Sequence, residues 1–145
     1  MRRPPRRARR PAAAALEFAI VVPLLLLLFL GLMEFSRSMT VLGIASNASR
    51  QGARAGAVTP GNYSAVVTAV NDALQPSGLA GLQTTEVRVN NVVVTNDVDF
   101  RLRATPGASI AVTVSIPYDR VSWVPGSRYL AGRTLAEGAV MRKEG

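Results

Sequence analysis

Glu17 is the residue with the clearest chemical potential, because it is the only charged residue in the apolar stretch 12–33. A carboxylate inside a lipid bilayer is costly, so an acidic residue in such a place is by default a candidate for a specific function. The alternative is that the side chain reaches back to the headgroups or to the preceding arginines. We favour a specific role for Glu17.

The other residues offer little chemistry. Asp97 and Asp99 could together bind calcium, but the pair lacks the number of ligands in a calcium loop, so a solvated turn is the preferred interpretation. The absence of cysteine and histidine excludes disulfides, Cys or His zinc sites, a cysteine nucleophile and a Ser-His-Asp triad. No base stands beside a serine, and the only lysine is Lys143. We therefore predict that the protein is not an enzyme and has no metal or cofactor.

The apolar stretch 12–33 has the length of a membrane span. A helix over it would measure roughly 33 Å, which matches the bilayer core of about 30 Å. We predict a transmembrane helix over residues 13–35. Pro23 lies inside it and removes one backbone hydrogen bond, so we expect a kink there.

The distribution of charge predicts the orientation of this helix. Six arginines lie within the first ten residues, whereas only Glu34 and Arg37 follow closely after the stretch. This bias predicts a cytoplasmic leader over residues 1–12 and a translocated C-terminal part. The leader also carries six of the eight net positive charges and alternates arginine with proline. It therefore indicates a topology signal in contact with membrane lipid rather than nucleic-acid binding.

Two alternatives to a specialised membrane protein stay open. A secretory signal peptide has the same order of basic and apolar segments, but its apolar run is usually about 7–15 residues, and no suitable cleavage site follows here. The chain could also be an uncleaved single-pass anchor that presents a small binding domain.

Residues 36–58 are expected to continue the helix outside the membrane. Ala48, Gly52 and Gly56 are spaced by four, so one helical face is small enough for another helix to approach closely. Its partner is either the protein's own domain or another subunit. Arg50 and Arg54 share a different face, which we expect to be solvated.

Residues 59–145 predict a small α+β domain. A helix is expected over 63–74 with Asn62 as its N-cap. The period then changes to two, which predicts strands over 86–95, with a turn at 96–97, and around Phe100 and Leu102, over 110–116 and over 130–141. Trp123, in a loop between the last two strands, is interpreted as plugging the end of the sheet rather than as an exposed contact.

The fold class is therefore α+β: a long N-terminal transmembrane helix continues into an extracytoplasmic helix, followed by a short helix and a small antiparallel β-sheet.

Two segments resemble a known family. AAAALEFAIVVPLLLLLFLGLMEFSRS (12–38) and ASNASRQGARAGA (45–57) are similar to the TadE-like family, the minor pseudopilins of the tight-adherence (Tad/Flp, type IVc) pilus system. The first segment combines a basic leader, an embedded Glu-Phe, a proline in the apolar run and a trailing Glu-Phe. The C-terminal half resembles the family only in its general pattern, a valine-rich sheet followed by a segment that ends near charged residues.

The resemblance implies a function in pilus assembly. A prepilin peptidase would cut between Ala12 and Ala13, where the family usually has glycine before the cut, and Glu17 would become the fifth residue. Its carboxylate could then neutralise the new N-terminus of a neighbouring subunit and fix the stagger of the packed helices. The implied partners are the peptidase, other minor pilins, the major Flp pilin and an inner-membrane platform. The implied role is to initiate, prime or cap a pilus used in adhesion or secretion.

Overall fold

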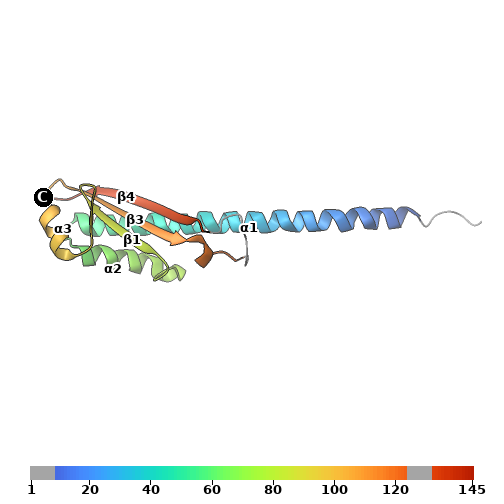
Figure 1. Cartoon of the computed structure of the whole chain (residues 1–145), viewed down its shortest axis with the longest axis horizontal. Helices are drawn as coiled ribbons and strands as arrows, with labels where there is room; N and C mark the ends of the chain where they lie inside the picture. Colours follow the sequence, from blue (N-terminus) through green and yellow to red (C-terminus); the bar gives the residue numbers. More distant parts are fainter. Residues whose placement is uncertain (1–8, 124–131) are drawn as a thin grey trace, which may run out of the picture. The chain divides into compact units, whose positions relative to one another are not determined.

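The computed structural model describes residues 9–123 and 132–145, which form three α-helices and a four-stranded sheet (Figure 1). The chain divides into two compact units, Met1–Ser36 and Arg37–Gly145. The predicted α+β class is confirmed. The elements in chain order are α1 (Arg9–Ala57), α2 (Tyr63–Leu74), η1 (Gln75–Ser77), β1 (Thr84–Val89), β2 (Val92–Val94), α3 (Asp97–Arg103), β3 (Ser109–Pro117), η2 (Tyr118–Arg120) and β4 (Thr134–Arg142).

Helix α1 is 49 residues long and passes through Pro23 without ending. Its residues in the first unit expose their apolar side chains: Leu16 is 66% exposed and Phe18 70% exposed. From Val41 onward the helix instead contributes fully buried side chains to the core of the second unit. One continuous helix therefore has an uncovered apolar part and a packed part.

The sheet of the second unit is antiparallel throughout, in the order β2-β1-β3-β4. Val87 of β1 lies opposite Val112 of β3, and Val89 lies opposite Ile110. These four side chains are buried on one face because alternate residues of a strand point to the same side. That face packs against α2 and the second half of α1. The buried core includes Val41, Ala45, Ala48, Val66, Val70, Leu74, Val87, Val89, Phe100, Ile110, Val112, Val114 and Ile116.

The small residues of α1 allow this packing. A Cβ atom added at Gly52 would lie 2.6 Å from Cγ2 of Val70 and 3.2 Å from Cγ1 of Val112. A Cβ atom at Gly56 would lie 2.9 Å from Cγ2 of Val66. The glycines therefore let the backbone of α1 approach α2 and β3 more closely than any larger residue would. Arg50 and Arg54 are exposed, as predicted.

The helix over 63–74 and the strand over 110–116 are confirmed as α2 and β3. The side chain of Asn62 accepts a hydrogen bond from the backbone N–H of Ala65 at 2.7 Å, so it is the N-cap of α2, as predicted.

The expected continuous strand over 86–95 is wrong. Asn90 and Asn91 have φ angles of 47° and 66°, and the chain reverses there to pair β2 with β1. Two successive residues with positive φ are typical of a type I′ hairpin turn, which asparagine tolerates better than most residues. The Asn-Asn pair is therefore a turn between two strands.

The expected strand around Phe100 and Leu102 is also wrong, because these residues belong to helix α3. The side chain of Asn96 accepts the backbone N–H of Asp99 at 2.8 Å and so caps the helix. Acidic residues in the first turn and Arg101 and Arg103 in the last turn favour a helix electrostatically. An alternating pattern this short does not separate a strand from one helical face.

Asp97 connects the starts of α2 and α3. Its carboxylate accepts the backbone N–H of Ser64 at 2.8 Å and the Ser64 hydroxyl at 3.1 Å. The Ser64 backbone N–H, followed by its hydroxyl and the charge of Arg101, lowers the pKa of Asp97 below its ordinary value of 3.8. Asp97 and Asp99 are therefore solvated, as expected, but they lie in the first turn of a helix instead of in a loop turn.

Trp123 does not plug the end of the sheet, because its side chain is 63% exposed. The last strand is β4, from Thr134 to Arg142, and the expected start of that strand at residues 130–131 lies outside the described residues.

The C-terminal residues cap the end of α1. The Lys143 ammonium donates hydrogen bonds to the backbone carbonyls of Val58 at 2.7 Å and Gly56 at 3.3 Å. The backbone N–H of Glu144 donates to the carbonyl of Ala57 at 2.9 Å. The last carbonyls of a helix have no partner within it and carry partial negative charge, so a cation there is favourable.

Substitution of Gly52 by alanine tests the close approach of α1. Overpacking of a stiff valine neighbour costs about 1–3 kcal/mol, and the helix preference of alanine offsets only about 0.5–1 kcal/mol. We therefore expect Gly52→Ala to lower the free energy of unfolding. The measurement is a urea titration of the full chain in detergent micelles, followed by Trp123 fluorescence.

The matched control is Gly43→Ala on the same helix, where an added Cβ has no neighbour within 4 Å. It is expected to raise the free energy of unfolding by about 0.5–1 kcal/mol. Equal unfolding midpoints for the two variants would contradict the packing argument.

Replacement of Asp97 by asparagine tests the link between α2 and α3. Because the pKa of Asp97 is lowered in the folded state, its stabilising effect is present above 3.8 and is lost as the pH falls through the folded-state pKa. Asp97→Asn should therefore be less stable than the native chain at neutral pH, and the difference should shrink in acid. Urea midpoints measured at neutral pH and below 3.8 check this, and a difference independent of pH would refute it.

Candidate functional site

The predicted processing and assembly residues lie together near the start of α1. Ala12, Ala13 and Glu17 are all in this helix. Ala13 and Glu17 are four residues apart, so they lie on one helical face about one turn from each other. The Glu17 side chain is exposed and makes no hydrogen bond or ion pair within the described residues. Its carboxylate is therefore open to a group from outside this chain.

The side chains around Glu17 are apolar and uncovered. The most apolar 18-residue window of α1 has a mean hydropathy of 2.6, and none of it is buried. Among the described residues, α1 is the one helix long and apolar enough to cross a membrane, which is compatible with a single-pass anchor. The large apolar side chains that are exposed in this part are Leu16, Phe18, Ile20, Val21, Leu24, Leu25, Leu26, Leu27, Leu28, Phe29, Leu30, Leu32, Met33 and Phe35.

Pro23 lies six residues beyond Glu17, on the exposed part of α1. Proline has no backbone N–H, so the carbonyl of Ala19 loses its partner within the helix. The position is a weak point in the hydrogen-bond ladder, and the kink there stays a prediction.

The small-residue face belongs to the second unit and is occupied by the chain's own domain. Ala48 is fully buried, and Gly52 and Gly56 face Val66 and Val70 of α2. Of the two partners considered from the sequence, the protein's own α2 and β3 fill this face.

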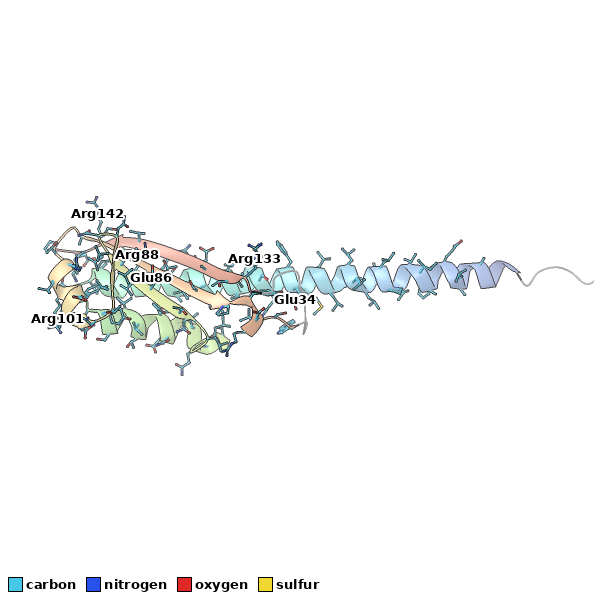
Figure 2. All side chains as sticks on the ribbon, viewed as in Figure 1. Glu34, Glu86, Arg88, Arg101, Arg133 and Arg142 are labelled. Carbon is cyan, nitrogen blue, oxygen red and sulfur yellow. The ribbon has the colours of Figure 1, made fainter. Side chains whose placement is uncertain are left out.

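From the sequence, Glu34 was considered only as a charged residue that follows the apolar stretch. Its side chain is 9% exposed, although Met33 and Phe35 on either side of it are 51% and 61% exposed. Figure 2 places it on α1, well along the helix from the N-terminal end. No local sequence signal predicts this burial.

The remaining charged residues are spread over the second unit. Figure 2 places Arg101 on α3 and Arg142 at the end of β4, whereas Glu86 and Arg88 lie on β1. Arg88 donates to Glu86 at 2.6 Å, and such an exposed ion pair contributes little to stability. Among the described residues, no three acidic, His or Cys side chains gather as a metal site would require.

A cavity of about 450 Å³ lies at the end of α1. Two of its lining residues, Arg101 and Lys143, are cationic, and Lys143 is already bound to backbone carbonyls. The lining contains no carboxylate, so the cavity offers no acid–base pair. The lining residues are Thr59, Pro60, Gly61, Asn62, Arg101, Ala104 and Lys143.

A comparison with protein families finds one match in this part of the chain. The model of the family described as TadE-like protein matches residues 12–54. The match contains Glu17 and Pro23 and ends two residues before Gly56, so it covers most of α1 and none of the sheet. No curated protein and no solved structure matches the chain.

The match covers less than half of the chain. Over residues 12–54 the chain is similar to the TadE-like family, which confirms the resemblance that its sequence motifs carry.

Proposed function

We propose that the protein is a membrane-inserted minor pilin or pseudopilin that helps to initiate, prime or cap a Flp-type pilus. The observation that carries the proposal is the division of α1 into an uncovered apolar part and a part built into a folded domain. Transfer of each large apolar side chain out of water contributes about 1.5–3 kcal/mol. The exposed part therefore needs lipid before assembly and neighbouring helices within a fibre.

The arrangement in the membrane follows from the sequence and from this division. Residues 1–12 form a cytoplasmic leader, residues 13–35 span the inner membrane, and residues 36–58 continue as an extracytoplasmic helix. Residues 59–145 form the extracytoplasmic domain. The arginine-rich leader supports this orientation.

Processing between Ala12 and Ala13 would create the group that Glu17 recognises. Hydrolysis of this peptide bond leaves a carboxylate on Ala12 and a positively charged amine on Ala13. In a low-dielectric environment this amine requires a negative partner. Glu17 of an adjacent subunit supplies it, and the pairing sets the axial offset between two helices.

In this mechanism the protein is a structural subunit and the substrate of a prepilin peptidase. Its further partners are other minor pilins, the major Flp pilin and the inner-membrane platform. The second unit keeps its small-residue face for its own core, so contacts with neighbouring subunits use other surfaces of the domain and the exposed part of α1.

An uncleaved anchor is the second candidate, because Ala12 stands where relatives usually have glycine. Edman sequencing of the protein purified from membranes distinguishes the candidates. We expect a chain that begins at Ala13. A chain that begins at Met1 would support the anchor, and a start beyond Met33 would support a secreted protein.

Substitution of Glu17 tests the assembly role. Loss of one partner of a buried charge pair costs about 3–5 kcal/mol, so Glu17→Ala should reduce surface pili at least about tenfold. Because the helix stays apolar, membrane insertion should be unchanged. Pili are counted by electron microscopy, and insertion is measured by carbonate extraction.

Two further variants make this experiment specific. Glu17→Gln keeps the size of the side chain but not its charge, and it should fail as Glu17→Ala does. Glu86→Ala removes an exposed carboxylate of β1 and should leave pili unchanged. Normal pili in Glu17→Ala cells would refute the proposed role.

A further inference from the structure

Arg37 and Trp123 form a contact that neither the core nor the assembly residues require. The guanidinium carbon of Arg37 lies 5.3 Å from the centre of the Trp123 ring, within the range of a cation–π interaction. Trp123 is the only tryptophan in the chain, and its side chain is 63% exposed. An exposed tryptophan in contact with an arginine is therefore a candidate binding site on the surface.

The charge of Arg37 has no counterion in the described part of the chain. Arg37 makes no ion pair there, and its Nε atom is buried without a hydrogen-bond partner. Stacking on an indole orients a guanidinium but does not neutralise it. The pair therefore combines a fixed positive charge with an exposed aromatic ring, which suits an anion attached to an apolar group.

The position of the pair along the chain identifies that anion. Arg37 is two residues beyond the proposed membrane span, which is about 3 Å along a helix. Trp123 contacts Arg37 and therefore lies close to the same depth. Tryptophan is enriched where the bilayer meets water, and arginine binds phosphate.

We propose that Arg37 and Trp123 bind phospholipid headgroups of the extracytoplasmic leaflet. The guanidinium binds the phosphodiester, and the indole lies between the headgroups and the acyl chains. This inference rests on the membrane span in the proposed function but not on pilus assembly. It gives the domain a second attachment to the membrane besides α1, which fixes the side of the domain that faces lipid.

The native tryptophan allows a direct test. The full chain is reconstituted in phosphatidylcholine vesicles that carry a nitroxide either on the headgroup or near the end of an acyl chain. We expect the headgroup nitroxide to reduce Trp123 fluorescence by at least about twofold and the deep nitroxide to have a much smaller effect. If the chains float with the vesicles but the fluorescence of Trp123 is not quenched, the headgroup proposal is overturned and the proposed membrane span is not.

The matched control moves the fluorophore to the opposite end of the domain. Val140 is 66% exposed, nearly as much as Trp123, and it lies on β4 three residues before Lys143. Lys143 binds the carbonyl of Gly56, which is about 28 Å along α1 from Arg37. The double variant Trp123→Phe/Val140→Trp should escape both quenchers, and equal quenching at the two sites would contradict the proposal.

The Arg37→Gln variant distinguishes binding of phosphate by Arg37 from mere closeness of Trp123 to the headgroups. It should weaken headgroup quenching of Trp123 by about twofold while leaving the unfolding midpoint in detergent within the range of surface substitutions. Inorganic phosphate added to the native chain in detergent should not change its fluorescence, because the proposed ligand is a headgroup in a bilayer. Undiminished quenching in Arg37→Gln, or a response to free phosphate, would overturn the assignment.

The two proposals fail in different ways. Glu17→Ala should lose pili and keep the quenching of Trp123, because Glu17 lies at the other end of the span. Chains that do not float with vesicles would overturn both proposals, since each requires the span.

Discussion

The approach of α1 to Val66, Val70 and Val112 is the contact on which the folded unit depends. Only glycine at positions 52 and 56 leaves room for these side chains. The contact joins α1, α2 and the strand β3 within one hydrophobic core. A chain without disulfides has no covalent link to replace it, and its stability rests on close packing.

The same helix serves two environments, and its sequence changes where the environment changes. In the first unit most apolar side chains are large and uncovered, as at Leu16 and Phe18. From Val41 onward the buried side chains are small, because they pack closely against valines of α2 and β3. Lipid accepts large apolar groups on every side of a helix, whereas a domain interior accepts only what its neighbours leave space for. One α-helix can therefore be both a membrane anchor and a part of a core.

Sequence analysis predicted the elements with long or strongly capped patterns. The apolar stretch, the Asn62 cap of α2 and the alternation in β3 each carry a local physical signal. The Asn90–Asn91 turn and α3 were not predicted, because their patterns are short and the turn depends on two positive φ angles. Ala12, Ala13 and Glu17 were predicted from motifs, and all three lie in the first part of α1.

Other residues could not be predicted because their partners lie far away in the sequence. Asp97 binds Ser64, which lies thirty-three residues earlier in the sequence. Trp123 contacts Arg37, although most of the domain's sequence separates the two residues. Neither contact can be predicted from a periodic pattern or from neighbouring residues in the sequence. Such contacts depend on how the sheet and helices are arranged, which hydrophobic patterns alone do not specify.

The cap that Lys143 and Glu144 place on α1 has a consequence for the order of folding. The end of α1 comes early in the second unit, whereas Lys143, which binds the carbonyl of Gly56, lies 87 residues later in the sequence. A chain shortened before Lys143 would leave the last carbonyls of α1 solvated, while α2 and β3 would still cover Gly52 and Gly56. The last turn of α1 is therefore capped only when β4 has joined the sheet, so it depends on a contact that is distant in the sequence.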